Sequence, residues 1–226
     1  MVLRIPGLAY QKGFGGHFHN DNSLAVFRDL PGIIVACPSN GIDAVKMIRR
    51  AVFEAYKNSR ITVFIEPIAL YMVKDLYKPK DRKWSFKYPD LNEEISIGEF
   101  AVHGQGSSLT IISYGNGFYL SMKARVEIEK ALNRKIKIID LRWLSDINIL
   151  HLLKSIGKCS KILIVDECRK NGCYGEGLVS DIFMATKKPL KIKLHAAENS
   201  FIPLGKAATV TLPSKQSIID HAIELY

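Results

Sequence analysis

Apolar and polar positions along this chain alternate with a period that switches between that of a strand and that of a helix. A short apolar run at residues 32–40 predicts a buried strand that ends in a turn. The next segment, 41–58, carries apolar residues every three or four positions, at Ile42, Val45, Ile48, Val52 and Tyr56. A β-branched run at 61–67 ends in proline. Together these segments predict a βαβ unit with parallel strands.

The same alternation returns in the second half of the chain. Apolar runs predict strands at residues 108–115, 135–144, 160–168 and 190–198. Amphipathic segments predict helices at residues 117–133, 147–157, 175–186 and 214–226. Strand and helix alternate throughout, so we expect an α/β fold with a mainly parallel sheet in this half.

Between the two halves, residues 74–95 are charged, contain two prolines and show no periodicity. Such a segment is typical of a linker or an excursion between domains. The chain is therefore expected to divide into an α/β block at 1–73, a linker at 74–95 and a second α/β block at 96–226.

Composition narrows the class of protein. The formal net charge is +10 over 226 residues, but residues 78–83 are the only basic run and no aromatic residues are interleaved with basic ones in an RNA-binding pattern. We therefore expect a basic surface without nucleic-acid binding. No apolar run reaches transmembrane length, and the start of the chain lacks a signal-peptide pattern. Neither a membrane protein nor a secreted one is expected.

The four cysteines agree with a reducing compartment. They show no CxxC spacing, which argues against a zinc or redox motif; they are Cys37, Cys159, Cys168 and Cys173. The expected location is the cytoplasm, or the mitochondrial matrix in a eukaryote.

The densest group of chemically active residues is the stretch GFGGHFHNDNS at residues 13–23. In an extended segment His17 and His19 would project from the same face. Three readings remain open: metal ligands, an acid/base or substrate-contacting pair, and a solvated polar turn. A metal site needs further ligands on neighbouring strand ends, and the other four histidines (His103, His151, His195 and His221) show no such arrangement. We therefore predict no metal ligands, and we favour the acid/base role.

Two further charged groups follow predicted strands. Asp166 and Glu167 end the strand at 160–168, where open α/β sheets gather ligands, although a strand-end turn or a helix cap explains them equally well. Asp140 and Arg142 lie two residues apart in the strand at 135–144. We interpret these two as a structural ion pair.

Several stretches resemble one protein family in order and spacing. The stretch from Arg4 to Ile48, with its glycine-rich loop, its histidines and the motif PGIIVACPSNGIDA, is similar to the second half of the pyrimidine-binding domain in the beta subunit of thiamine-diphosphate-dependent 2-oxoacid dehydrogenases. VFIEPIALY fits the strand that follows. The motifs IGEFAVHGQGSSLTIISYG, IIDLRWLSDIN, ILIVDEC and CYGEGL resemble the transketolase C-terminal domain of the same subunits.

The resemblance implies a function and a division of labour. Residues 1–73 would be the C-terminal half of a pyrimidine-binding domain, and 96–226 a transketolase C-terminal domain. The activity would be oxidative decarboxylation of pyruvate or a branched-chain 2-oxoacid, with thiamine diphosphate and Mg²⁺ as cofactors and a lipoyl group as the acyl acceptor. His19 falls on the family's active-site histidine, with His17 as an auxiliary. Asn20, Asp21 and Asn22 would orient the imidazoles.

The implied partners are an alpha subunit carrying the diphosphate-binding domain, a second beta subunit and a lipoyl acyltransferase core. The family's cofactor-binding glutamate and its diphosphate motif have no counterpart in this sequence, so cofactor-binding residues are unassigned. The family's proline after the DLR-x-L strand is also replaced, in LSDIN. We expect the isolated chain to be inactive. Two alternatives stay open: a metal-dependent hydrolase using His17 and His19, and a non-catalytic fragment that only assembles.

Overall fold

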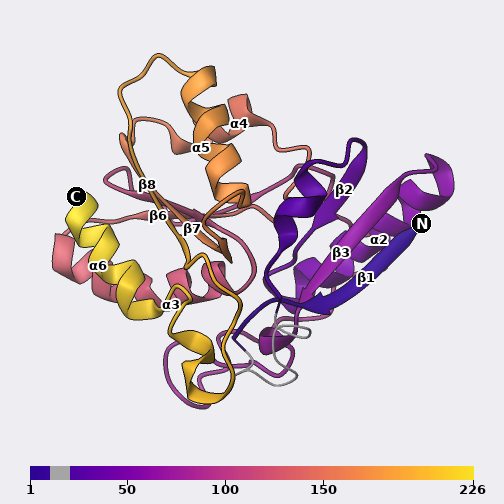
Figure 1. The fold of residues 1–226 in the computed structure, drawn as a ribbon, viewed down its shortest axis with the longest axis horizontal. Coiled ribbons are helices and arrows are strands. Elements are labelled where there is room, and N and C mark those ends of the chain that lie inside the picture. Colours follow the sequence, from indigo (N-terminus) through magenta and orange to yellow (C-terminus); the bar gives the residue numbers. More distant parts are fainter. Residues whose placement is uncertain (11–20) are drawn as a thin grey trace.

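The computed structural model describes residues 1–10 and 21–226 as two sheets flanked by helices (Figure 1). The strands are β1 (Val2–Gly7), β2 (Ile33–Ala36), β3 (Ile61–Pro67), β4 (Ala101–His103), β5 (Thr110–Ser113), β6 (Lys137–Asp140), β7 (Lys161–Arg169) and β8 (Lys191–Ala197). The α-helices are α2 (Gly41–Lys57), α3 (Gly115–Leu132), α4 (Ile149–Ile156), α5 (Tyr174–Ala185) and α6 (Lys215–Leu225). Short 3-10 helices are η1 (Leu24–Arg28), η2 (Ile68–Leu70) and η3 (Gly205–Thr209).

The first half of the chain forms a three-stranded parallel sheet, sheet A, in the order β1-β3-β2. The predicted βαβ unit is confirmed, since β2 and β3 are parallel and α2 connects them. Strand β1 was not predicted. It contains Arg4 and Pro6, which interrupt an apolar run, and such residues are common on edge strands.

The second half forms a five-stranded sheet, sheet B, in the order β4-β6-β5-β7-β8. Only β4, which was not predicted, is antiparallel. Helices α3 and α6 pack on one face of sheet B, and α4 and α5 pack on the other. Parallel sheets normally need both faces covered, and sheet B meets that requirement within the chain. The predicted α/β class with mainly parallel sheets is therefore confirmed.

The two sheets are joined through the segment that leaves β6. The backbone of Cys37 donates to the carbonyl of Arg142, and that of Leu144 donates to the carbonyl of Val35, both at 2.8 Å. Between these bonds, Trp143 is fully buried beside β2. The segment thus extends sheet A at its β2 edge. One hydrophobic core includes residues of both sheets, such as Val35 and Ile164.

Residues 74–95, predicted to be a linker, contain no helix or strand. They are nevertheless tightly hydrogen-bonded. The Asp81 carboxylate accepts from four backbone N–H groups, including those of Leu76 and Lys83, at 2.8–3.1 Å. Leu76 and Trp84 are buried in the core beside Phe118 of α3. Whether each block folds alone on either side of this segment stays a prediction.

Helix α2 begins and ends close to the predicted bounds, which were residues 41–58. Met47 and Ala51 are fully buried against sheet A. Of the apolar residues that predicted the helix, Val52 is 54% exposed and Tyr56 is 81% exposed. The apolar residues whose spacing predicted the helix are therefore not the ones that sheet A buries most deeply. None of the helices among the described residues is long and apolar enough to cross a membrane.

Candidate functional site at the junction of the two sheets

Buried polar side chains gather where the carboxyl ends of β2, β3, β5, β6 and β7 approach one another. Four of them are fully or almost fully buried carboxyl groups or amides from sheet B and its helices: Asn116, Asp140, Asp166 and Glu167. Strand ends of this kind are the usual place for ligands in open α/β sheets. The junction is therefore the candidate functional site among the described residues.

Glu167 lies at the centre of this junction. Its Oε1 accepts from the backbone N–H of Asn116 at 2.9 Å, and its Oε2 accepts from the side-chain amide of Asn116 at 2.7 Å. A Cβ added at Gly115 would lie 2.5 Å from Glu167 Oε1, 3.3 Å from Cys37 Sγ and 3.5 Å from Pro67 Cγ. Gly115 is thus the point where α3, sheet A and β7 meet, and its φ of +51° suits glycine.

The protonation of Glu167 differs from that of a surface glutamate. Burial raises the pKa of its carboxyl to about 8, aided by neighbouring Asp166 and opposed by the bonds from Asn116. Burial also raises the pKa of the Cys37 thiol well above its usual value, and the carboxyl of Glu167 adds to that shift. At neutral pH the pair is therefore a protonated acid beside an un-ionised thiol, which argues against Cys37 as a nucleophile.

Asp166, by contrast, has a structural role. Its Oδ1 accepts from the Tyr114 hydroxyl at 2.5 Å and from the Cys168 backbone at 2.8 Å. Its Oδ2 accepts from the Gly175 backbone at 2.7 Å, in the first turn of α5. This is the helix-cap role that the sequence left open for the strand end, and the carboxylate also suits the positive end of the helix.

The polar residues that follow the histidine stretch are anchored to the end of β7. Asn22 donates from Nδ2 to the carbonyl of Glu167 at 2.8 Å. The guanidinium of Arg169 donates to Asn22 Oδ1 at 3.0 Å and to Asp21 Oδ1 at 3.1 Å. Both ends of the Asn22 amide are therefore engaged by β7. The predicted site residues His17 and His19, together with Asn20, lie outside the described residues, so their acid/base role stays a prediction.

Asp140 and Arg142 do not form the ion pair that their spacing predicted. Arg142 makes a bidentate ion pair with Asp43 of α2, with both N–O distances at 2.9 Å. Asp140 instead accepts a hydrogen bond from the Ser39 hydroxyl at 2.8 Å. The prediction was wrong because the chain turns at Arg142, whose φ of +62° directs the side chain to α2.

The carboxyl group of Asp140 also has a shifted pKa. Its Oδ2 has no hydrogen-bond partner among the described residues. Burial, and then the carboxylate of Asp43, raise the pKa of Asp140 to about 7, against the effects of Ser39 and Arg142. The junction thus holds two carboxyl groups that release protons near neutral pH.

The remaining histidines lie away from the junction. His195 Nε2 is 2.7 Å from the Ser217 hydroxyl, and burial lowers the pKa of His195 to about 4. Its ring centroid is 4.3 Å from that of His221. His103 stacks on Phe118, and His151 lies beside Phe100. The described residues contain no group of three or more potential ligands for a metal ion.

The junction offers no accessible free groups for the phosphates of thiamine diphosphate or for Mg²⁺. The junction's carboxyl groups are buried and bonded within the protein, and Arg169, which could bind a phosphate, is engaged by Asp21 and Asn22. The junction therefore does not form a diphosphate site. Sequence reasoning missed Ser39 and Asn116, although their position just after predicted strands was a usable signal.

Comparison with known proteins places this chain in a class. Residues 98–203 match the family of the transketolase C-terminal domain. A split-gene transketolase, described as an inactive beta4 tetramer, superposes with a TM-score of 0.68 at 16% identity, covering 98% of this chain and 65% of that one. A transketolase from Campylobacter jejuni gives a TM-score of 0.63 at 14% identity, covering 99% and 31%. Residues 98–203 are thus similar to transketolase C-terminal domains, and the fold as a whole is transketolase-like.

The curated relatives are more specific. The beta subunit of the pyruvate dehydrogenase E1 component from Staphylococcus epidermidis is 27% identical in an alignment 216 residues long that covers 92% of this chain. The subunit of the same name from Staphylococcus aureus is 27% identical over 218 residues, or 93% of this chain. These relatives confirm the resemblance to 2-oxoacid dehydrogenase beta subunits. The chain spans 62% of the length of each of these two relatives.

Proposed function

We propose that this chain is part of the beta subunit of a thiamine-diphosphate-dependent 2-oxoacid dehydrogenase, acting on pyruvate. The observation that carries the proposal is the continuous similarity to pyruvate dehydrogenase beta subunits over 92% of the chain. The transketolase C-terminal domain and the transketolase-like fold support it. Branched-chain 2-oxoacids are the alternative substrates, on the resemblance of the sequence motifs to 2-oxoacid dehydrogenases as a family.

Within such an enzyme this chain contributes a histidine-bearing segment and its support. His19 donates a proton to the substrate oxygen or to the sulfur of a lipoyl acceptor, and His17 assists it. Asp21 and Asn22, held by Arg169 and the carbonyl of Glu167, anchor the end of that segment on β7. Thiamine diphosphate and Mg²⁺ are held by a partner alpha subunit, since the family's diphosphate motif has no counterpart in this sequence. The complete assembly adds a second beta subunit and a lipoyl acyltransferase core in the cytoplasm or mitochondrial matrix.

Reconstitution tests this proposal. Alone, the chain should show no micromolar binding of thiamine diphosphate by calorimetry and release no carbon dioxide from pyruvate. Co-purified with the alpha subunit from its own organism and with any separate chain that supplies the remaining part of a beta subunit, it should give lipoyl-linked turnover. In that assembly His19→Ala should lower turnover by roughly 10²-fold. His17→Ala should cost less.

The outcomes separate the alternatives. Tight cofactor binding by the isolated chain contradicts the proposed division of labour. A stable assembly without turnover would identify an assembly fragment. Wild-type turnover in both histidine variants would assign that segment to a solvated turn.

A further inference from the structure

The C-terminal ends of α4 and α5 carry lysines but no acids. Each helix ends just before a strand of sheet B begins, α4 before β7 and α5 before β8, so both end at the edge of the sheet opposite the junction. The two segments that surround these helix ends, residues 150–160 and 183–190, contain no aspartate or glutamate. They contain four lysines: Lys154, Lys158, Lys187 and Lys188.

Hydrogen bonds hold the two segments against each other. The Lys188 ammonium donates to the carbonyls of Gly157 and Cys159, at 2.7 Å and 2.8 Å. The backbone N–H of Lys191 donates to the carbonyl of Ser160 at 2.7 Å. Lysines from two separate parts of the sequence therefore form one surface. We call it the α4–α5 end, and its exposed residues are Lys154, Lys158, Phe183, Met184, Lys187 and Lys188.

The positive charge at this surface exceeds what the two helix ends offset. The C-terminus of a helix carries a partial negative charge of about half a unit, so two ends offset about one of the four ammonium groups. The ammonium of Lys188 is the one bonded to carbonyls at the end of α4. No carboxylate among the described residues lies in salt-bridge contact with Lys154, Lys158 or Lys187. A net positive charge therefore remains at the α4–α5 end.

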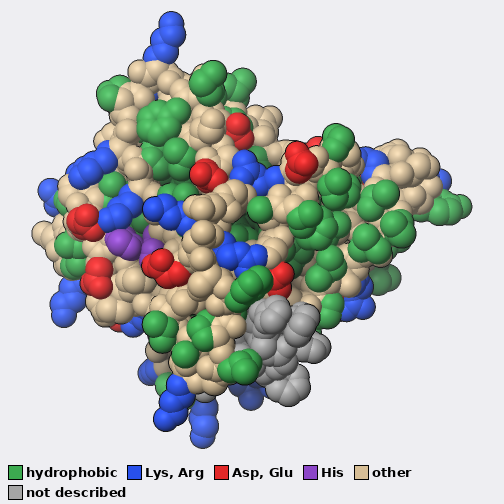
Figure 2. Space-filling model, viewed as in Figure 1, with side chains coloured by type: hydrophobic (Ala, Val, Ile, Leu, Met, Phe, Trp, Pro, Cys, Tyr) green, Lys and Arg blue, Asp and Glu red, His purple; other side chains and the backbone are tan. Residues whose placement is uncertain are grey.

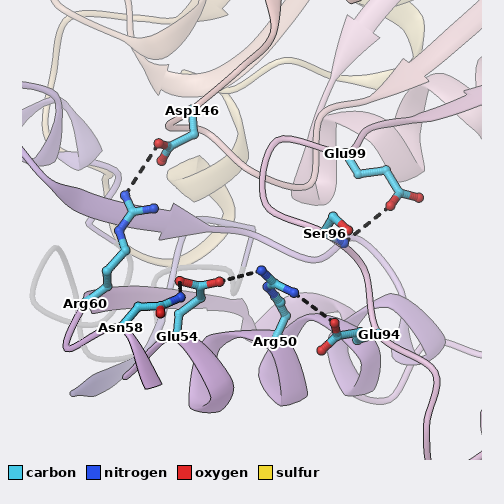
Figure 3. A network of polar contacts seen from close by, with 8 residues as sticks. All are labelled: Arg50, Glu54, Asn58, Arg60, Glu94, Ser96, Glu99 and Asp146. Atoms are coloured by element: carbon cyan, nitrogen blue, oxygen red, sulfur yellow. Dashed lines mark hydrogen bonds and ion pairs between the residues drawn. The ribbon is translucent and has the colours of Figure 1, made fainter. Parts of the chain in front are cut away.

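The cations around α2 show the opposite arrangement. Figure 3 shows Arg50 of α2 between Glu54 and Glu94, and Arg60, just before β3, facing Asp146. Those guanidinium groups have their counter-charges within the chain. The α4–α5 end has no acid in either of its two segments, so an acidic partner would supply the missing counter-charge.

Two apolar side chains lie beside these lysines. Phe183 and Met184 belong to the last turn of α5, and they are 51% and 87% exposed. No other large hydrophobic side chain among the described residues is more exposed than Met184. Figure 2 shows hydrophobic side chains, with Lys or Arg side chains near them, over the part of the molecule where Figure 1 places α5 and β8. A partner at this surface therefore meets apolar and cationic groups together.

The α4–α5 end is the outer layer of a sheet that is already covered on both faces. Helices α3 and α6 pack on one face of sheet B, and α4 and α5 pack on the other. Both α4 and α5 lie within residues 98–203, the part that matches the transketolase C-terminal family. Their outward sides need no further layer to complete this α/β unit. An occupant of the α4–α5 end therefore comes from a separate polypeptide.

The distribution of charge along α5 favours a polypeptide over a membrane surface. Glu176 and Asp181 are exposed on the same helix, N-terminal to Phe183. A bilayer with anionic lipids covers a broad area and would bring its negative charge against these two acids as well. A short acidic segment can follow the lysines alone.

We propose that the α4–α5 end is a docking surface for an acidic segment of a partner polypeptide. Carboxylates of that segment lie against Lys154, Lys158 and Lys187, and an apolar side chain of the same segment packs on Phe183 and Met184. The surface is remote from the junction, and the inference does not depend on the chemistry proposed above.

The test uses the full chain and a short peptide with glutamates in its first half and leucines in its second. Calorimetry should show saturable binding, and the Kd should rise as salt is added, because the contacts are between exposed charges. A second peptide carries glutamines in place of the glutamates and keeps the leucines and the length. It should bind about tenfold more weakly or worse.

A matched pair of charge reversals locates the site. Lys154→Glu should raise the Kd of the glutamate peptide about tenfold or more. Lys130→Glu is the control, since Lys130 is likewise an exposed lysine in the last turn of its helix, α3, which lies on the other face of sheet B. Both variants change the net charge by the same amount and place an acid at a helix C-terminus. The control should leave the Kd nearly unchanged.

A second pair tests the apolar contact. Met184→Ser should raise the Kd several-fold without affecting the fold, because an 87% exposed side chain packs on little in the free chain. Leu150→Ser is the control, since Leu150 is 71% exposed and lies in the first turn of α4, away from the α4–α5 end. It should keep the wild-type Kd.

Four results would overturn the proposal. One is no saturable binding of the glutamate peptide to the wild-type chain. Another is equal binding of the glutamine peptide, which would remove the charge argument. The third is an equal loss of affinity in Lys154→Glu and Lys130→Glu, which would assign binding to net charge alone. The last is sedimentation of the chain with phosphatidylserine vesicles that Lys154→Glu abolishes, because a membrane would then occupy the surface.

Discussion

Asp140 and Glu167 are carboxyl groups that folding removes from water, and their proton uptake has consequences for stability. Both have raised pKa values, about 7 and about 8, with burial as the main cause. A carboxyl group with a raised folded-state pKa favours folding in its protonated form. It therefore contributes most below its unfolded pKa, near 4, and this contribution is lost as the pH rises through the folded pKa.

Asp140→Asn tests this relation at the residue scale. The amide keeps an acceptor for the Ser39 hydroxyl and cannot ionise, so the variant should match the wild type near pH 4. Between pH 4 and pH 8 the wild type should lose stability relative to the variant, by on the order of a few kcal/mol. Urea unfolding at several pH values measures the difference. Asp181→Asn, at an exposed position of α5, is the control and should show no such divergence. Parallel curves for wild type and Asp140→Asn would refute the prediction.

At the scale of elements, the contact between α3 and the two sheets depends on Gly115. A methyl group there meets Glu167 Oε1 at 2.5 Å and also requires a side chain at φ +51°. The crowding and the backbone strain would both arise at the start of α3, where the backbone N–H of Asn116 donates to Glu167. Helix α3, sheet A and β7 thus meet at Gly115, where there is no room for a side chain.

Gly115→Ala should lower stability by about 2–4 kcal/mol, the sum of backbone strain and crowding in a packed interior. Gly32→Ala separates the cost of backbone strain from that of crowding, because Gly32 has φ +83° but no atom within 4 Å of an added Cβ. That control should lose only the strain, about 1 kcal/mol. Thermal unfolding of the two variants gives the comparison. Equal losses would mean that the contact with Glu167 costs nothing.

At the scale of the whole molecule, residues 74–95 connect the two α/β blocks, and their resistance to local opening determines whether a protease can separate the blocks. The segment carries many trypsin sites, including Lys80, Arg82 and Lys83, yet its backbone is held by carboxylates. Although burial opposes it, hydrogen bonds from the backbone of Lys83, Leu76, Tyr77 and Lys78 hold the pKa of Asp81 well below its usual range. Cleavage needs local opening, and these bonds oppose that opening.

Asp81→Ala should therefore speed tryptic cleavage within 74–95 several-fold and release a stable fragment beginning near Ser96. Mass spectrometry of a digestion time course identifies the first cut. Asp90→Ala is the control, since the Asp90 carboxylate accepts none of these bonds. If the first cut in the variant falls within 100–220, residues 74–95 are not the weakest connection, and the predicted domain boundary would be wrong.

Much of the fold could be predicted because it depends on local pattern. The βαβ unit and the alternating elements of sheet B follow from runs of apolar residues whose period is a local property of the chain. The edge strands β1 and β4 were not predicted. Arg4 and Pro6 interrupt the apolar pattern of β1, the run at 101–103 is too short to show a period, and both strands are stabilised by partners far away in the sequence.

What the sequence by itself determined is the α/β class and the resemblance to 2-oxoacid dehydrogenase beta subunits. Only the tertiary structure decided which charged groups meet. Arg142 pairs with Asp43, 99 residues away in the sequence, rather than with Asp140 beside it. The same holds for α2, whose two apolar sides look alike in sequence until sheet A selects one. Long-range partners are chosen by how the layers pack, and spacing along the chain carries no record of that choice.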